Sequence, residues 1–379
     1  MDDIYYDEVL MSEEMMYNST DSTPQQFEFS DYKQRVIVAI LYLIMALLGI
    51  FGNTLVIIAV LLSKKLRTAT NAFVVSLSVA DLLTCLVLPW NAAAALGRDG
   101  PPFGEWVCSV VAVVQSTTIG CSTYTLAAIG LQRLLLITRP PTYHAIYTRK
   151  KMAAWLVVTW LVPFLFTLVP PLLDVGEVGY NRKYHHCGFT SSHERSNDYD
   201  LIIAGGLYPL PLVTILVCYV LIWRHLRRHA RNVTTSSEET TESASMNLST
   251  VCDSVGATKG RSLRRSPTPH GTLNAAKVNR SQNEITKNMF YIVCAFMVCL
   301  TPFAICLFYD DSDPFLPYAS AILVFNSCIN PLIYATKHRV FHVVFGCIIR
   351  RKWDSIPEPS EFLKAMRRRQ FCSRSGFYV

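Results

Sequence analysis

The hydrophobic residues of this chain gather into long runs that are separated by shorter polar segments. Each run holds about 20 residues or more, which is the length that an α-helix needs to cross roughly 30 Å of hydrocarbon. The runs cover residues 36–62, 71–96, 107–138, 152–173, 201–223, 288–309 and 315–335. This pattern predicts an all-α membrane protein with a bundle of seven transmembrane helices.

A further helix is predicted after the last run. Residues 337–348 alternate basic and apolar side chains at helical spacing. This is typical of a short amphipathic helix that lies on the membrane surface, in contact with lipid. Cys347 in this helix is a candidate for palmitoylation. The runs and the surface helix together define a predicted helical domain over residues 35–348.

Polar segments flank and interrupt this domain. Residues 1–34 form an acidic tail with a glycosylation sequon that begins at Asn18, and residues 349–379 form a second tail. Residues 229–283 are rich in Ser and Thr and poor in apolar residues, so we expect a disordered loop there. No signal peptide is visible, and the first run is expected to serve as an uncleaved signal anchor.

The basic residues of the loops predict the orientation of the chain in the membrane. Lys64, Lys65 and Arg67 lie between the first two runs, whereas the next loop holds only Arg98. Cytoplasmic loops carry the excess of Lys and Arg, so the N-terminus is predicted outside and the C-terminus inside. The net charge of +7 reflects this excess and gives no argument for nucleic-acid binding.

Charged residues are almost absent from the runs themselves. Of Asp, Glu, Lys and Arg, only Asp81 and Arg133 occur there. A charge inside a bilayer is costly, so such residues mark functional sites. Arg133 lies near a helix end and has the alternative of reaching the surface, but Asp81 is short and lies in the middle of its run. We therefore expect Asp81 to have polar partners.

The positions of the cysteines predict a single disulfide. The chain holds 12 cysteines, and most of them lie within the runs, where a thiol packs as a small apolar group. With the N-terminus outside, only Cys108 and Cys187 lie on the extracellular side. A bridge between them fits an oxidising exterior.

Short motifs occur in a fixed order, each on its own run. They are Gly52-Asn53-Thr54-Leu55-Val56, Leu77-Ser78-Val79-Ala80-Asp81, Cys108 at the start of the third run, Trp160, Pro211 with Tyr219, Phe296 with Pro302, and Asn330-Pro331-Leu332-Ile333-Tyr334. In these motifs the chain resembles the rhodopsin-like (class A) G-protein-coupled receptors over residues 36–348, which makes residues 35–348 a receptor domain.

Two stretches resemble particular groups within these receptors. Leu66-Arg67-Thr68-Ala69-Thr70-Asn71-Ala72-Phe73-Val74-Val75 is similar to the invertebrate Moody-type orphan receptors. Cys187-Gly188-Phe189 follows a pattern that melatonin receptors and the medium-chain fatty-acid receptor share, so these look like relatives.

The resemblance implies a polar core around Asp81. In class A receptors the matching residues hold a sodium ion in the inactive state, and all of them here carry oxygen atoms, which suit a hard cation. A polar packing network without an ion is the alternative. The matching residues are Asn53, Asp81, Ser122, Asn326, Ser327 and Asn330.

The resemblance also assigns G-protein coupling to Arg133, its neighbour Gln132, Tyr219 and Tyr334. In the family an acid precedes the arginine and restrains it at rest, whereas here the triplet is Gln132-Arg133-Leu134. The tryptophan that usually precedes the proline of the sixth span is replaced as well. These departures predict a weakly restrained inactive state.

Candidate ligand-pocket residues follow by position, although ordinary helix packing is an equal alternative for each. They are Trp90, Asn91, Gln115, Phe189, Phe303, Leu307 and Ser320. Amine receptors have an aspartate at the position of Gln115, and opsins have a lysine at the position of Val324, so neither ligand class is expected.

The resemblance implies a plasma-membrane receptor, not an enzyme, that carries the signal of an extracellular ligand to a heterotrimeric G protein. A non-signalling scavenger or adhesion receptor is the alternative, and the scarcity of charge in the spans disfavours a transporter or channel. Arrestin is expected to bind phosphorylated Ser and Thr residues of the loop at 229–283. The C-terminal Gly376-Phe377-Tyr378-Val379 is a candidate ligand for a PDZ domain.

Overall fold

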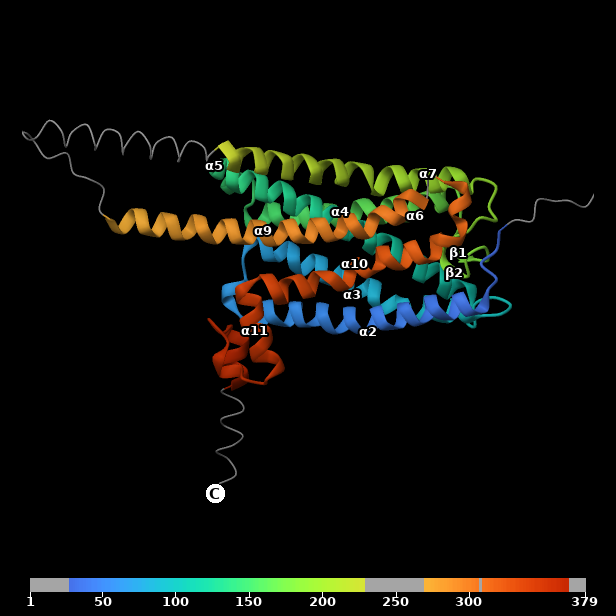
Figure 1. Cartoon of the computed structure of the whole chain (residues 1–379), viewed down its shortest axis with the longest axis horizontal. Coiled ribbons are helices and arrows are strands. Elements are labelled where there is room, and N and C mark those ends of the chain that lie inside the picture. The colour runs from blue at the N-terminus through green and yellow to red at the C-terminus, as the bar shows by residue number, and fades with distance from the viewer. Residues whose placement is uncertain (1–26, 229–268, 307–308, 368–379) are drawn as a thin grey trace, which may run out of the picture.

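The computed structural model in Figure 1 describes residues 27–228, 269–306 and 309–367. Within these ranges, seven helices are long and apolar enough to cross a membrane, which confirms the predicted fold class. They belong to α2 (Tyr32–Leu62), α3 (Ala69–Leu96), α4 (Glu105–Thr138), α6 (Arg149–Leu172), α7 (Ser196–Leu207) with its continuation over 209–228, α9 (Pro269–Cys306) and α10 (Leu316–Lys337).

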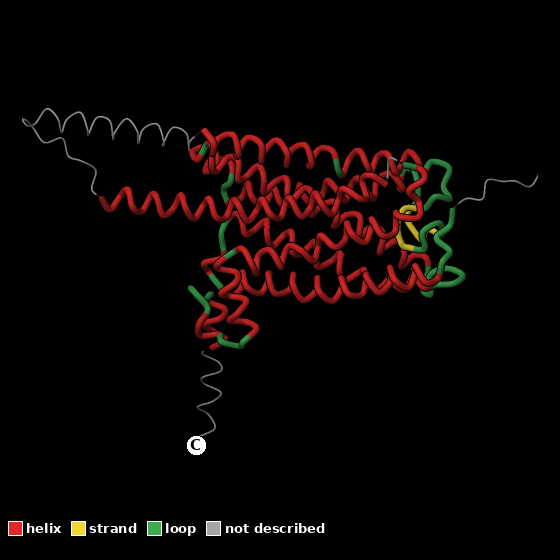
Figure 2. The backbone as a smooth tube through the Cα atoms, viewed as in Figure 1, coloured by secondary structure: helices red, strands yellow, loops and turns green. Residues whose placement is uncertain are grey.

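Shorter elements connect these helices. They are the 3-10 helix η1 (Lys64–Leu66), α5 (Pro140–Ile146), strands β1 (Val178–Asn181) and β2 (His186–Phe189), η2 (Asp310–Phe315), α11 (Arg339–Ile349) and η3 (Trp353–Ser355). The two strands form an antiparallel hairpin in which Tyr180 lies opposite Cys187. Figure 2 shows the long helices running side by side, with the hairpin at one end of the bundle.

Local signals in the sequence start several of these helices. The side chain of Asp31 accepts a hydrogen bond of 2.9 Å from the backbone N–H of Lys33 at the start of α2. The hydroxyl of Thr68 accepts one of 3.2 Å from Asn71 at the start of α3. Such caps satisfy N–H groups that have no partner within the helix.

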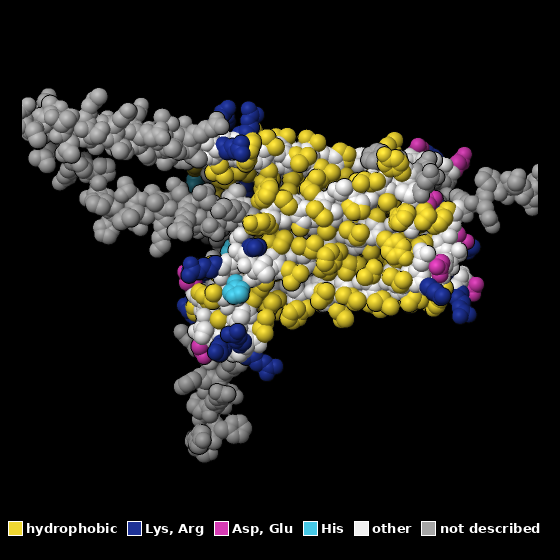
Figure 3. All heavy atoms as spheres, viewed as in Figure 1, with side chains coloured by type: hydrophobic (Ala, Val, Ile, Leu, Met, Phe, Trp, Pro, Cys, Tyr) yellow, Lys and Arg dark blue, Asp and Glu magenta, His cyan; other side chains and the backbone are white. Residues whose placement is uncertain are grey.

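The outer surface of the bundle is apolar. In Figure 3 hydrophobic side chains form a broad belt over the helices, and charged side chains lie toward its two ends. Leu47 and Phe51 of α2 are 72% and 64% exposed, as is Val298 of α9 at 70%. A soluble protein would hide such side chains, whereas the hydrocarbon of a membrane covers them.

Helix α9 begins earlier than the sequence pattern indicated. It starts at Pro269, inside the segment 229–283 that was expected to be a disordered loop, while residues 229–268 lie outside the described ranges. After Gly271 this stretch contains neither Gly nor Pro, so no residue in it breaks a helix. Adding such residues to an existing membrane helix costs little, because only the first turn of a helix is expensive to form.

The chain that follows α11 folds back onto the loop between α2 and α3. We call residues 353–367 the tail clasp. Ser63 forms a β-bridge with Pro359, and the N–H of Lys64 donates a hydrogen bond of 2.8 Å to the carbonyl of Glu358. The first part of the predicted C-terminal tail is therefore bound to the receptor by backbone hydrogen bonds.

An apolar cluster holds the tail clasp in place. Leu363 is completely buried, Ile356 is 3% exposed, and both pack in one cluster with Leu62 of α2. Cys347 of α11 belongs to the same cluster and is only 9% exposed. The thiol that was singled out for palmitoylation therefore lies beneath the docked clasp.

Releasing the clasp should expose this thiol. We expect Leu363→Asp to raise the rate at which a maleimide labels Cys347 by about tenfold or more, because a carboxylate does not stay in an apolar cluster. Mass spectrometry of the peptide that contains Cys347 measures the rate. Phe362→Asp is the matched control, since Phe362 is 63% exposed. Equal labelling of both variants would show that the clasp does not cover the thiol.

Candidate functional site

A buried carboxylate joins three helices at the centre of the bundle. Asp81 of α3 is fully buried. Its Oδ1 atom accepts hydrogen bonds from the hydroxyls of Ser122 of α4 at 3.0 Å and Ser327 of α10 at 2.9 Å. Its Oδ2 atom accepts a third from the amide of Asn330 at 2.8 Å. Ser122, Ser327 and Asn330 thus bind Asp81 directly, as the sequence suggested.

Asn53 connects this network to α2. Its side-chain amide donates to the carbonyls of Gly49, at 3.0 Å, and of Ser327, at 2.9 Å. It therefore acts one step away from Asp81, through the backbone of the residue that holds the carboxylate. Asn326, the residue before Ser327 on α10, is 5% exposed.

The polar core contains buried oxygen atoms that have no hydrogen-bond partner among the described residues. They are Oδ1 of Asn53, Asn326 and Asn330, and the hydroxyl oxygen of Ser78 in α3. Buried acceptors without partners are costly. Together with the acidic Asp81, these oxygens match the chemistry of a hard cation such as sodium or of bound water.

The residues assigned to G-protein coupling lie on α4, α10 and the helix at 209–228, toward the end of the bundle opposite the disulfide. Gln132 and Arg133 are 0% and 2% exposed, and the hydroxyls of Tyr219 and Tyr334 are buried without a hydrogen-bond partner among the described residues. Neither amide atom of Gln132 has such a partner, so Gln132 makes no hydrogen bond to Arg133. Leu300, which replaces the usual tryptophan, packs in the apolar core of the bundle.

A contact that the sequence did not reveal closes the same end of the bundle. The side-chain amide of Asn288 in α9 donates a hydrogen bond of 3.0 Å to the carbonyl of Lys337, the last residue of α10. Asn288 opens the sixth hydrophobic run, where a single amide gives no signal of its partner. This bond connects the two helices at that end of the bundle.

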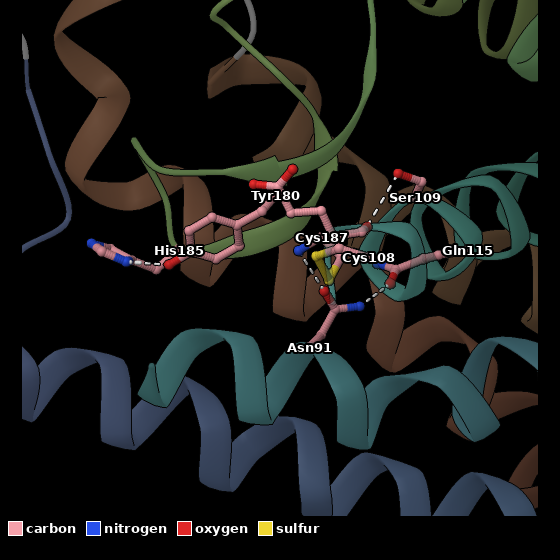
Figure 4. Close-up of a disulfide and its surroundings, with 8 residues drawn as sticks. Asn91, Cys108, Ser109, Gln115, Tyr180, His185 and Cys187 are labelled. Carbon is pink, nitrogen blue, oxygen red and sulfur yellow. Dashed lines mark hydrogen bonds between the residues drawn. A yellow bond between two sulfur atoms is a disulfide. The ribbon is translucent and has the colours of Figure 1, made fainter. Parts of the chain in front are cut away.

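The disulfide between Cys108 and Cys187 is confirmed, with Cα atoms 4.9 Å apart. It ties β2 to the first turn of α4, as Figure 4 shows. The N–H of Cys187 also donates to Oδ1 of Asn91 at 2.9 Å, and the amide of Asn91 donates to Gln115. Asn91 and Gln115 are therefore in contact, and Asn91 connects Gln115 to the backbone of the hairpin.

The other ligand-pocket candidates each have their own contacts among the described residues. Trp90 is 47% exposed and packs edge-on against Phe103 of the next loop. Phe189 packs against Tyr199 at 4.9 Å between ring centres. Phe303 contacts Tyr208, and Leu307 lies outside the described residues, as does Asn18. Ser320 lines a cavity of about 20 Å³ under the hairpin, together with Tyr42 and His186.

The hairpin packs together with the segment before α2. We call residues 178–189 and 27–31 the lid. The N–H of Phe29 donates to the carbonyl of Lys183 at 2.8 Å, and Phe29 is only 4% exposed. His185 bonds to the hydroxyl of Tyr180 at 2.7 Å and to the carboxylate of Glu28 at 3.0 Å. No local pattern in the sequence indicates these contacts, apart from the adjacent His185 and His186 before Cys187.

A salt bridge closes the other side of the lid. The ammonium group of Lys183 lies 2.7 Å from the carboxylate of Asp313, which also accepts a hydrogen bond of 2.6 Å from the hydroxyl of Tyr184. Asp313 belongs to η2, just before α10. The lid therefore spans from α2 to α10.

The lid should loosen at acidic pH. Burial lowers the pKa of His185, and the nearby Arg35 lowers it further, while Glu28 acts in the opposite direction. Burial also lowers the pKa of His186. Both histidines are thus held neutral in the docked lid, and a free histidine titrates near pH 6.5. The stability of the docked lid is fully present above that pH and is lost as the pH falls below it.

Hydrogen exchange of residues 178–189 measures this effect after correction for the intrinsic pH dependence of exchange. We expect weaker protection at pH 5 than at pH 7.5. The double variant His185→Gln, His186→Gln should lose most of that difference. Protection that falls equally in this variant would assign the effect to other groups.

The fold and its buried polar core define a seven-transmembrane receptor. A model of one family, the 7 transmembrane receptor (rhodopsin family), matches residues 52–334. The chain belongs to this family, which consists of receptors rather than enzymes. It is therefore a multi-pass membrane protein, and the resemblance on which the sequence analysis depended is confirmed.

The chain is also similar to particular receptors and to a solved structure. It is 26% identical over 342 residues to the G-protein coupled receptor moody of Drosophila melanogaster, covering 82% of this chain and 51% of the relative. It is 34% identical over 191 residues to melatonin receptor type 1B-A of Danio rerio, covering 50% and 65%. The crystal structure of squid rhodopsin superposes with a TM-score of 0.67 at 18% identity, over 88% of this chain and 90% of that one, and shows the same fold.

The chain thus spans about half the length of the moody receptor that it matches. The likeness to Moody-type and melatonin receptors is confirmed, whereas the likeness to the medium-chain fatty-acid receptor stays a prediction.

Proposed function

We propose that this protein is a plasma-membrane receptor that couples an extracellular ligand to a heterotrimeric G protein. The observation that carries the proposal is the hydrogen-bond network of Asp81, which joins α3, α4 and α10 at the centre of the bundle. A change in the position of one of these helices alters the hydrogen bonds of the other two. Such a network can transmit a change from the extracellular end to the cytoplasmic end.

The extracellular end is the one that carries the lid and the disulfide. Lys64, Lys65 and Arg67 lie at the opposite end, beside η1, which supports an extracellular N-terminus and a cytoplasmic C-terminus. Asn18 lies on the extracellular side of this topology, and its glycosylation stays a prediction.

A sodium ion fits the polar core. Asp81 would hold it, with oxygen atoms from Ser122, Ser327, Asn326 and Asn330 as further ligands. The ion supplies a positive charge that offsets the buried carboxylate. Ser78 lies about one turn before Asp81 on α3. Its hydroxyl oxygen and Oδ1 of Asn53 also have no hydrogen-bond partner among the described residues, so a network of bound water without an ion is the alternative.

The cytoplasmic residues have separate parts in this proposal. Outward movement of α9 breaks the bond between Asn288 and Lys337 and uncovers Arg133. The guanidinium group of Arg133 then donates hydrogen bonds to the G protein. The hydroxyls of Tyr219 and Tyr334 are buried and have no hydrogen-bond partner in the part of the chain that the structure describes, so they are available to stabilise the moved helices.

The proposal is tested with the purified full-length receptor in lipid nanodiscs and purified G proteins of each subtype. We expect the receptor to accelerate guanine-nucleotide exchange on one subtype, above the rate in empty nanodiscs. A ligand screen with the same readout follows. No acceleration on any subtype, with or without ligand, would favour the non-signalling scavenger or adhesion receptor.

The residue before Arg133 should set the basal activity. We expect Gln132→Asp to lower nucleotide exchange in the absence of ligand by several-fold, because a carboxylate there can pair with the buried guanidinium and stabilise the resting state. Gln132→Leu removes the same amide without adding charge and serves as the control. Basal exchange that is unchanged or raised in the aspartate variant would contradict this account.

Three further assignments extend the proposal. Arrestin is expected to bind phosphorylated Ser and Thr residues of the loop predicted at 229–283, of which residues 229–268 lie outside the described ranges. A PDZ domain is expected to bind the end at Val379, which also lies outside them. One glycine added after Val379 should abolish binding to a PDZ-domain array. Palmitoylation of Cys347 requires the tail clasp to leave first, because the thiol is buried beneath it.

A further inference from the structure

A cleft opens between the end of α4 and the helix formed by residues 209–228. It encloses about 530 Å³. Leu134 and Leu135 of α4 and Leu221 of the other helix supply its apolar part. The cleft lies at the same end of the bundle as Arg133. The residues that line it lie on these two helices, apart from Arg139, which directly follows α4.

The other part of the cleft is strongly basic. Arg139, Arg224 and Arg228 line it, and no Asp or Glu does so within the described residues. All three arginines are exposed. Leu221, Arg224 and Arg228 are three and four residues apart and share one face of their helix. Three guanidinium groups thus line one cleft, and no carboxylate in its described lining neutralises their positive charge.

The division between apolar and basic parts matches the boundary of the membrane. Leu134 and Leu135 lie within α4, the apolar belt of Figure 3 covers the helices, and the basic side chains lie toward its end. The leucines are therefore at the depth of acyl chains, and the arginines are at the depth of lipid headgroups. Basic pockets between helices on the cytoplasmic side suit anionic lipids.

We propose that this cleft binds a polyphosphorylated inositol lipid of the cytoplasmic leaflet. Each guanidinium can hold a phosphate through two parallel hydrogen bonds. Three of them around one cleft match a headgroup that carries several phosphates, whereas a headgroup with a single net charge leaves most of the arginine charge uncompensated. His225 also lines the cleft and adds a hydrogen-bond donor. The acyl chains lie along the leucines.

This inference depends on the proposed cytoplasmic orientation but not on G-protein coupling, so its test contains no G protein. Purified full-length receptor is titrated with a fluorescent phosphatidylinositol bisphosphate in neutral mixed micelles. We expect Arg228→Gln and Arg224→Gln each to weaken binding about tenfold, the loss of one charged hydrogen-bond pair. Melting curves establish that each variant is folded.

Arg227→Gln is the matched control. Arg227 lies next to Arg228 and carries the same charge, but it stacks on the ring of Trp223 at 4.0 Å and does not line the cleft. We expect its lipid affinity to stay within about twofold of the original. Equal losses in the Arg227 and Arg228 variants would reduce the effect to general surface charge and overturn the proposal.

Competition identifies the ligand. Phosphatidylserine at equal total charge should displace little of the fluorescent lipid, and inorganic phosphate at the same concentration should displace none. Full displacement by phosphatidylserine would overturn the assignment to an inositol lipid. Full displacement by inorganic phosphate would assign the cleft to a free anion and overturn the lipid.

Discussion

Replacing Asp81 with leucine is expected to lower the melting temperature of the receptor by roughly 6–12 °C. The carboxylate accepts hydrogen bonds from Ser122, Ser327 and Asn330 in a fully buried site. Leucine leaves these three donors without an acceptor, and each buried group that loses its partner costs about 1–3 kcal/mol. At the low end the three groups together cost about 3 kcal/mol. Each kcal/mol lowers the melting temperature by roughly 2–4 °C, which gives the expected range.

Asp81→Asn is the informative comparison, because it changes the charge and keeps the shape. Its carbonyl oxygen can still accept from both serines. Its amide then faces Asn330, whose own Oδ1 has no partner within the described ranges, so rotation of the Asn330 amide restores a hydrogen bond. We therefore expect Asp81→Asn to melt within a few degrees of the original receptor in a buffer without sodium, a small change beside that of the leucine variant.

Sodium should separate the two accounts of the polar core. If an ion binds Asp81, sodium chloride stabilises the original receptor over choline chloride at equal ionic strength, and Asp81→Asn loses this stabilisation. If the core holds only water, the two salts give the same melting curve for both proteins. The second result would reject the ion and keep the network.

Removing the disulfide should produce the second large effect. The double variant Cys108→Ala, Cys187→Ala is expected to lose about 2–4 kcal/mol of stability, because the bridge restricts the unfolded chain. It also frees β2 from α4, so the lid should lose hydrogen-exchange protection near Cys187. Melting curves and exchange of residues 178–189 measure the two effects.

A reducing agent provides the internal control for this experiment. It should destabilise the original receptor as much as the double substitution does, and it should have no effect on the variant that lacks the bridge. Cys306→Ala removes a half-buried thiol outside the bridge and should behave like the original receptor. A reductant effect that persists in the double variant would point to a different disulfide.

The sequence predicted the features that follow from hydropathy and spacing. A run of apolar residues long enough to cross a bilayer admits few structures besides a helix, because the backbone must satisfy its own hydrogen bonds there. Asn326 and Asn330 are four residues apart and share a face of α10, which brought Asn330 to Asp81. Cys108 and Cys187 were matched because topology left no other extracellular pair.

Other features depend on contacts between residues far apart in the chain. Lys64 and Glu361 form a salt bridge of 2.6 Å although they are 297 residues apart in the sequence. Neither residue has a local sequence pattern that predicts this contact. The same holds for Asn288 and the backbone of Lys337. Trp90 was assigned to the pocket by its position alone, and its edge-on contact with Phe103 of the following loop has no local signal in the sequence.

The tail clasp sets a limit on how this protein can be shortened or fused. A truncation just after α11 would look harmless from the hydropathy pattern. It would nevertheless remove the residues that cover Leu62 and Cys347 and leave an exposed apolar surface and an exposed thiol. Such a product would be prone to aggregate and to form intermolecular disulfides during purification. Tags and fluorescent reporters therefore belong after residue 367, where the described part of the chain ends.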